Sequence, residues 1–73
     1  MSAPAATALL RQLSATFNVR VTEEPYTDTK SGLEMWKLTA VSPSGERWTS
    51  RHEDHYKAAC GLAGLMGFEM EDG

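Results

Sequence analysis

The segment His52-Glu53-Asp54-His55 combines residue types that bind metal ions or transfer protons. Zinc sites in proteins use imidazole nitrogen, thiolate sulfur and carboxylate oxygen as ligands, so this cluster could supply part of one. The segment, however, spans the predicted end of a strand and the start of a helix, so its spacing does not place both imidazoles on one helix face. The sequence also offers no third, distant ligand of the usual types. We therefore expect no metal site and no cofactor, and we expect Glu53 and Asp54 to complement the positive N-terminal end of the helix.

Cys60 is the only cysteine and the only thiol that could act as a nucleophile. A nucleophilic thiol needs a neighbouring base, and His55 lies five positions earlier, off its helical face. Gly61, Gly64 and Gly67 are spaced three apart in or at the end of a predicted helix, whereas the glycines of a phosphate-binding loop follow a strand. We expect no catalytic residues and predict that the protein is not an enzyme. A lone cysteine permits no intrachain disulfide, and this fits a reducing, cytoplasmic setting.

Basic residues recur at alternating positions of three predicted strands. Alternation places side chains two apart on the same face of a sheet. One face should therefore hold the apolar residues, among them Trp36, Leu38 and Trp48, and we expect both tryptophans in the core. The other face should carry the candidate partner-binding residues, which are Arg20, Lys37, Arg47, Thr49 and Arg51. Thr22 and Thr39 belong to the same face.

This cationic face has two interpretations. Threonine is common on exposed strands, so the face could be an ordinary solvated sheet surface. Alternatively, cations gathered without intervening carboxylates raise the local potential and speed the encounter with an acidic partner. The face lacks aromatic residues, and sheet-type binders of single-stranded nucleic acid need aromatic platforms for base stacking, so that mode is disfavoured.

The hydrophobic periodicity predicts the helices and strands that carry these residues. Ala6, Leu9, Leu10, Leu13 and Phe17 form one helical stripe, which predicts a helix over residues 4–17. The period then changes to two, which predicts three strands. These are a strand from Val19 that ends before Pro25, a strand over Met35–Val41 and a strand over Glu46–Arg51, joined by a hairpin loop over Tyr26–Gly32 and a tight turn at Pro43-Ser44-Gly45.

A second helix is predicted to begin after an N-cap at Asp54 and to end near Gly67. Gly61 and Gly64 lie inside it, and each costs about 1 kcal/mol relative to alanine. We expect close packing to compensate, because Ala58, Gly61, Leu62, Ala63 and Leu65 form a surface of low relief. The fold class is therefore α+β, with the order α-β-β-β-α, a three-stranded antiparallel sheet and both helices on one face.

Size and charge limit the domain organisation. A chain of 73 residues and 8.0 kDa has room for one small core, and its 41% hydrophobic and 23% charged residues are typical of a folded globular protein. Basic and acidic groups balance over residues 1–68, so the net charge of −3 lies in Glu69, Glu71 and Asp72. We predict one compact domain over 1–68 and a short acidic tail over 69–73. No apolar run suits a membrane span or a signal peptide, so we expect an untargeted, monomeric protein with no membrane contact.

The element order and the run from Trp36 to Leu65 resemble the double-stranded-RNA-binding domain across nearly the whole chain. Asp54-His55-Tyr56-Lys57-Ala58 aligns with the Ser-Lys-Lys-x-Ala opening of the second helix in that family. The family binds phosphates with lysines at this helix start, where this chain has His55 and Tyr56 beside two carboxylates that would repel RNA. The resemblance therefore implies the fold, and nucleic-acid binding remains the alternative function.

In length, compact α/β character and acidic end, the chain also resembles small phage-encoded proteins that bind the RNA polymerase of the host bacterium. Such proteins block initiation by displacing or excluding the σ factor, and some promote antitermination. This resemblance implies a stoichiometric binder without turnover that acts in the host cytoplasm. We accordingly expect a protein-binding regulator of transcription with bacterial RNA polymerase as its partner.

Overall fold

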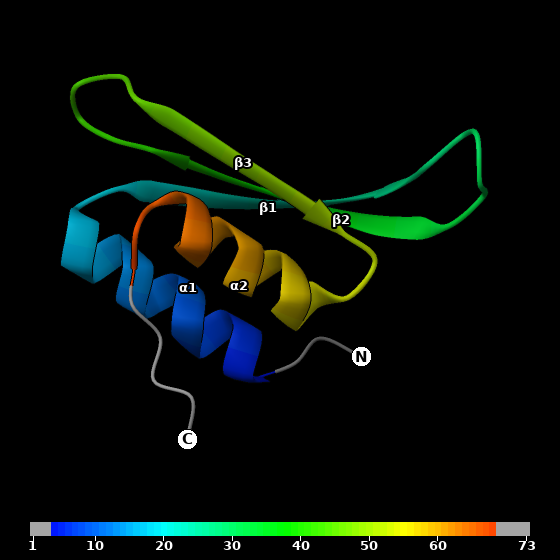
Figure 1. The fold of residues 1–73 in the computed structure, drawn as a ribbon, viewed down its shortest axis with the longest axis horizontal. Helices are drawn as coiled ribbons and strands as arrows, with labels where there is room; N and C mark the ends of the chain where they lie inside the picture. The colour runs from blue at the N-terminus through cyan, green and yellow to red at the C-terminus, as the bar shows by residue number, and fades with distance from the viewer. Residues whose placement is uncertain (1–3, 69–73) are drawn as a thin grey trace.

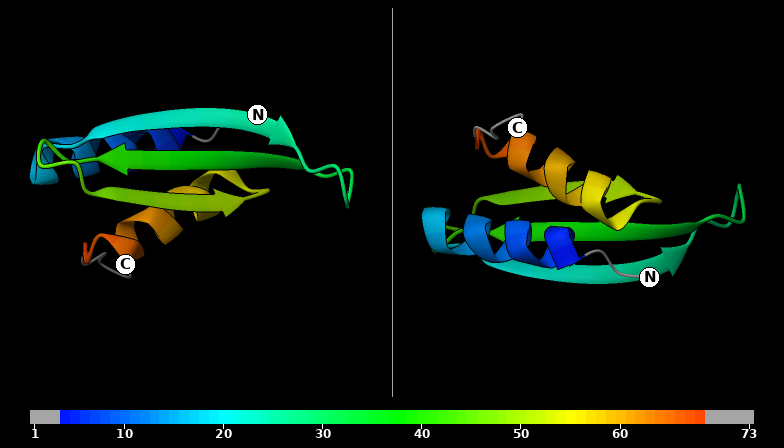
Figure 2. Two further views of the ribbon diagram at one scale, coloured as in Figure 1. Left: turned by 90° about the horizontal axis from the view of Figure 1, so that it is seen from above. Right: turned by 90° about the horizontal axis from the view of Figure 1, so that it is seen from below.

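A computed structural model describes residues 4–68 of the protein. Its elements are α1 (Pro4–Phe17), β1 (Arg20–Thr27), β2 (Glu34–Val41), β3 (Arg47–His52) and α2 (His55–Leu65). The three strands form one antiparallel sheet in the order β1-β2-β3. Figures 1 and 2 show both helices on the same side of this sheet. The predicted fold class and the α-β-β-β-α order are confirmed.

The helix α1 has the predicted bounds. Its apolar stripe is buried at Ala6, Leu9, Leu10 and Leu13, which recur at the three- and four-residue spacing of one helix face. Asn18 ends the helix with φ of 54°, a left-handed conformation that asparagine tolerates better than most residues. The chain then turns directly into β1.

The strand β1 runs through Pro25 to Thr27, so the prediction that it ends before Pro25 was wrong. Pro25 lies opposite Trp36, whereas Tyr26, which was assigned to the hairpin loop, pairs with Met35. Proline is tolerated in an edge strand when its missing N–H would have pointed away from the sheet. Pro25 meets this condition, because the backbone groups at its position in β1 point away from β2. The strand β3 begins at Arg47 and ends at His52, one residue later at each end than predicted.

The helix α2 has the predicted caps. The side chain of Asp54 accepts a hydrogen bond from the backbone N–H of Lys57 at 3.0 Å. At the other end Gly67 has φ of 78°, and the N–H of Phe68 donates to the carbonyl of Ala63. This arrangement is a common helix ending and needs a residue that tolerates positive φ.

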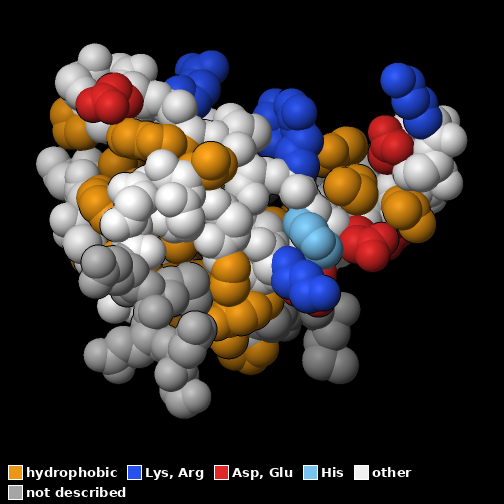
Figure 3. Space-filling view, viewed as in Figure 1, with side chains coloured by type: hydrophobic (Ala, Val, Ile, Leu, Met, Phe, Trp, Pro, Cys, Tyr) orange, Lys and Arg blue, Asp and Glu red, His pale blue; other side chains and the backbone are white. Residues whose placement is uncertain are grey.

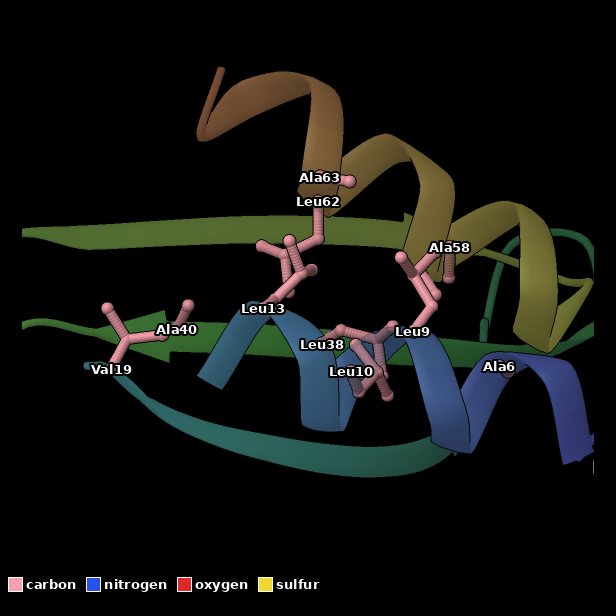
Figure 4. Packing of buried hydrophobic residues seen from close by; sticks show 11 residues of the cluster. Ala6, Leu9, Leu10, Leu13, Val19, Leu38, Ala40, Ala58, Leu62 and Ala63 are labelled. Atoms are coloured by element: carbon pink, nitrogen blue, oxygen red, sulfur yellow. The ribbon is translucent and has the colours of Figure 1, made fainter. Parts of the chain in front are cut away.

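The core lies between the sheet and the two helices and consists mainly of leucine and alanine. Figure 4 shows side chains from both helices converging on β2. The buried hydrophobic residues are Ala6, Leu9, Leu10, Leu13, Val19, Leu38, Ala40, Ala58, Ala59, Leu62 and Ala63. Both tryptophans lie on this side and are half-buried against the core. Cys60 is also half-buried against it.

The predicted close packing occurs at one of the two glycines in α2. A Cβ at Gly61 would lie 2.7 Å from Oγ of Ser50 on β3, so a side chain there would meet the sheet. A Cβ at Gly64 would meet nothing within 4 Å, and Leu65 is 58% exposed. The surface of low relief on α2 therefore packs against the rest of the protein at Ala58, Gly61 and Leu62, whereas Gly64 and Leu65 at its C-terminal end are exposed.

Within residues 4–68, neither helix is long and apolar enough to span a membrane. The predicted acidic tail over 69–73 lies outside the described residues.

Candidate functional site

The candidate site is the face of the sheet that points away from the helices, here called the outer face. Strand register arranges its residues in rows that cross the sheet. The rows are Arg20–Val41–Arg47, Thr22–Thr39–Thr49, Glu24–Lys37–Arg51 and Tyr26–Met35. The structure thus brings all five predicted site residues onto one face, with a threonine row between two rows that contain cations. Neighbouring rows are two residues apart along each strand. The two rows that contain cations are therefore four residues apart, which corresponds to about 13 Å.

The outer face is strongly positive. Arg20, Arg47 and Arg51 are exposed and Lys37 is half-buried. Figure 3 shows Lys and Arg side chains projecting from the upper surface, on the side of the sheet away from the helices. Over residues 4–68 no carboxylate lies within ion-pair distance of these four cations, because the one carboxylate so close to a basic side chain is Glu23, which contacts His55. Their positive charge is therefore available to a partner.

Two expectations about this face need correction. Glu24 lies on it directly across from Lys37, so the cations are not free of intervening carboxylates. Tyr26 also lies on it, beside Met35, so the face does not lack an aromatic residue. The two corrections have different causes. Glu24 lies within the predicted strand, and alternation from Arg20 through Thr22 already places it on this face. Tyr26 joins the face because β1 is longer than predicted and its alternation continues past Pro25. The β-prone residues Tyr26 and Thr27 were the sequence signal for this extension.

The outer face can bind but carries little that could catalyse. Its side chains within the strands are cationic, hydroxylic or apolar, except for the single carboxylate of Glu24. Guanidinium and ammonium groups recognise carboxylates and phosphates through charge-assisted hydrogen bonds. Threonine hydroxyls can both donate and accept. The chemistry of the face therefore suits recognition of an anionic surface.

The His52–His55 segment forms the junction between β3 and α2. The Nδ1 atom of His52 accepts a hydrogen bond from the backbone N–H of Asp54 at 2.9 Å. The hydrogen bond from the N–H of Lys57 holds the pKa of Asp54 below its ordinary value, because it stabilises the ionised carboxylate. No group of three histidine, cysteine or acidic residues is positioned to hold a metal ion in the described part of the chain.

His55 points into the molecule instead of outward. Its ring is buried and stacks on the Trp36 indole, with ring centroids 4.1 Å apart and planes 15° from parallel. Its Nε2 atom lies 2.5 Å from Oε1 of Glu23. A carboxylate oxygen only accepts, so Nε2 carries the proton in this bond. His55 therefore anchors the start of α2 to both β1 and β2.

An open groove borders the outer face where β1 begins and β2 ends. It is lined by Ser14, Asn18, Val19, Arg20, Val21, Val41, Ser42 and Pro43. Arg20 is the only charged residue in this lining, and the other polar groups are hydroxyls and one amide. The groove extends the outer face at its Arg20 end and has no set of convergent groups that would define a small-molecule site.

Comparisons of the chain with protein-family models, with curated proteins and with solved structures found no match.

Proposed function

We propose that the protein is a non-catalytic regulator that binds an acidic surface of a protein partner through its outer face. The observation that carries this proposal is the group of four cations on one face, with no carboxylate in ion-pair distance within residues 4–68. Unpaired charge of one sign steers association with an oppositely charged surface and contributes to specificity. The chain as a whole has a net charge of −3, so this face is positive against an overall acidic background.

The partner we propose is bacterial RNA polymerase. The resemblance to small phage-encoded regulators supports this choice, and it implies inhibition of initiation through σ-factor displacement, antitermination, or both. A small domain can offer only a modest footprint, so a few anchors should dominate the binding energy. Arg20, Lys37, Arg47 and Arg51 are the proposed anchors, with Thr49 between the two arginines of β3.

The test uses immobilised protein and purified bacterial RNA polymerase, as core enzyme and as holoenzyme. The Arg47→Glu/Arg51→Glu variant should lose at least tenfold in affinity at low salt, because both reversed charges lie on the outer face. The Arg11→Glu/Lys30→Glu variant is the matched control, since it makes the same charge change at exposed residues of α1 and the hairpin loop. Equal losses in both variants would exclude the outer face, and no binding of either enzyme form would exclude this partner.

Nucleic-acid binding is the second candidate, and Tyr26 on the outer face favours it. Cations could follow a phosphate backbone while this ring stacks on a base. The start of α2 argues against a double-stranded-RNA-binding mode, because Glu53 and Asp54 are exposed there beside a single lysine, Lys57. Titration with duplex and single-stranded RNA and DNA at about 50 mM salt tests this function, and binding should weaken steeply as salt rises. A flat titration excludes it.

A further inference from the structure

Within residues 4–68 no further strand pairs with either edge of the sheet, and the two edges differ in the backbone groups they present. In an antiparallel ladder, alternate residues of an edge strand point their N–H and C=O groups toward the neighbouring strand, and the others point them outward. The two hairpins fix which residues do which. The N–H of Ser42 donates to the carbonyl of Glu46, and the N–H of Asp28 donates to the carbonyl of Leu33. Counting in steps of two from these pairs identifies the outward residues on each edge.

On β1 the outward residues are Val21, Glu23, Pro25 and Thr27, by the register with β2. Pro25 has no N–H, so this edge lacks a donor in its middle. A proline on an edge strand is one of the devices by which proteins prevent an additional strand from pairing. The β1 edge is therefore closed to strand addition.

On β3 the outward residues are Arg47, Thr49 and Arg51, by the register with β2. Each retains its N–H, and β3 contains no proline. Since the side chains of these same residues lie on the outer face, an added strand would place its facing side chains beside both arginines. The β3 edge can therefore pair with a fourth strand, and it favours a strand that carries carboxylates four residues apart.

On the inner side of this edge, α2 presents an exposed apolar side chain. Figure 2 shows the C-terminal half of α2 extending beyond β3, outside the outline of the sheet. Gly61 closely approaches Ser50 of β3, and Leu65 follows one turn later on the same side of α2. Leu65 is 58% exposed, and the neighbouring Gly64 has open space at its Cβ position. A fourth strand would lie above this part of α2 and could cover Leu65 with its own apolar side chains.

We infer that the β3 edge binds an extended acidic segment of the partner protein as a fourth strand. The segment would carry carboxylates at positions i and i+4, opposite Arg47 and Arg51, and apolar residues at i+1 and i+3 above α2. This inference rests on the proposed function and specifies how the partner docks. Main-chain hydrogen bonds supply affinity in such strand addition, and alternate side chains supply specificity.

The charge pattern works against a second copy of this chain as the occupant in the fully overlapping register. Antiparallel pairing of two β3 edges centred on Thr49 would place each Arg47 across from the Arg51 of the other copy. Like charges directly opposite each other destabilise a strand pair. The β1 edge of a second copy is interrupted at Pro25, so it offers no better match.

The experiment uses the full chain and an acetylated, amidated heptapeptide of sequence Thr-Glu-Val-Thr-Val-Glu-Thr. One control peptide is N-methylated at the central threonine, which removes the main-chain donor aimed at Thr49 and keeps both charges. A matched control peptide is N-methylated at the following valine, whose N–H points away from β3, so it keeps the donor aimed at Thr49. On the protein side, Thr49→Pro removes the outward N–H of β3. Binding is measured by calorimetry, and amide exchange by NMR locates the site.

The inference predicts that the heptapeptide binds the wild type and slows amide exchange at Arg47, Thr49 and Arg51. N-methylation at the central threonine and Thr49→Pro should each weaken binding at least tenfold, and N-methylation at the following valine should leave it within about twofold. Equal binding of the methylated and unmethylated peptides would overturn strand addition and leave the charged face as the docking surface. Absence of peptide binding up to about 1 mM would also overturn it, whereas the RNA polymerase assay judges the proposed function separately. Self-association through β3, seen by analytical ultracentrifugation and abolished by Thr49→Pro, would overturn the choice of occupant.

Discussion

The side chains of each strand alternate between the two faces of the sheet, and the two faces differ in chemistry. The inner face is mostly apolar and packs against the helices, whereas the outer face is cationic and hydroxylic. On β2, Leu38 and Ala40 are fully buried against the helices, whereas Lys37 and Thr39 between and beside them lie on the outer face. Burial of apolar surface is the main stabilising term in folding, and exposed charges contribute little. Stability should therefore reside on the inner face and recognition on the outer face. Substitutions one residue apart should separate the two properties.

The largest expected effect is the loss of stability from a truncation on the inner face. Leu38→Ala should lower the free energy of unfolding by about 2–5 kcal/mol, because it removes buried methyl groups and leaves a cavity in a small core. The adjacent outer-face variant Thr39→Val keeps the β-branched shape and should change stability by less than about 0.5 kcal/mol. Urea denaturation followed by tryptophan fluorescence measures both. Similar losses from the two variants would contradict the division between the faces.

His55 tests the division between the faces at a polar side chain, because its ring lies on the inner side of the sheet. His55→Ala should cost about 2 kcal/mol or more, since it removes a buried ring stacked on Trp36 and a hydrogen bond to Glu23. His52→Ala should cost less than about 1 kcal/mol, because its ring is half-buried and makes one hydrogen bond to a backbone N–H. Chemical denaturation of both variants tests this ranking. A larger cost at His52 would show that the junction, and not the buried ring, holds α2 to the sheet.

The sequence predicted the fold well because the hydrophobic periods are clear. The stripe of α1 and the caps of α2 are local signals, and both helices have the predicted starts. The sequence also predicted which cations share a face, since alternation needs only the strand positions. It did not predict that β1 continues past Pro25, because whether a proline fits depends on which way its N–H would point in the sheet. The continuation past Pro25 moved Tyr26 into the candidate site, whereas alternation from Arg20 within the predicted strand was enough to place Glu24 there.

The burial of His55 also could not be predicted from the sequence. A run of two histidines and two carboxylates has the composition of a metal site, and only the packing of α2 against β1 and β2 turns one imidazole inward. The sequence also could not show that the β1 and β3 edges differ. That difference depends on which residues point their backbone N–H and C=O groups outward, and the hydrogen bonds of the two hairpins determine this. Contacts between distant segments therefore account for most of what the sequence could not show.

A smaller effect is expected where α2 meets the inner side of β3. Gly64→Ala should stabilise the protein by about 0.5–1 kcal/mol, because alanine favours helix and the added Cβ meets nothing. Gly61→Ala should stabilise less, since its Cβ would lie 2.7 Å from Oγ of Ser50. Removing that hydroxyl with Ser50→Ala should restore the gain, which a double-mutant cycle on denaturation midpoints would detect. Additive effects at Gly61 and Ser50 would contradict the close approach of α2 to β3.

The smallest effect concerns exposed charges and appears as a dependence on pH. The pKa of Asp54 is lowered chiefly by the hydrogen bond from the N–H of Lys57, and that of Asp28 by hydrogen bonds from Ser31. A carboxyl whose pKa is lower in the folded state stabilises the fold above its unfolded pKa, and this contribution disappears as the pH falls through the folded value. Thermal unfolding should therefore shift to lower temperature as the pH drops below about 4.

Asp54→Asn and Asp28→Asn should each flatten this acid dependence, because asparagine still accepts a hydrogen bond but does not titrate over this range. Melting curves between pH 7 and pH 2.5 compare the single and double variants with the wild type. If the double variant kept the full acid dependence, the stabilising carboxylate would have to lie elsewhere.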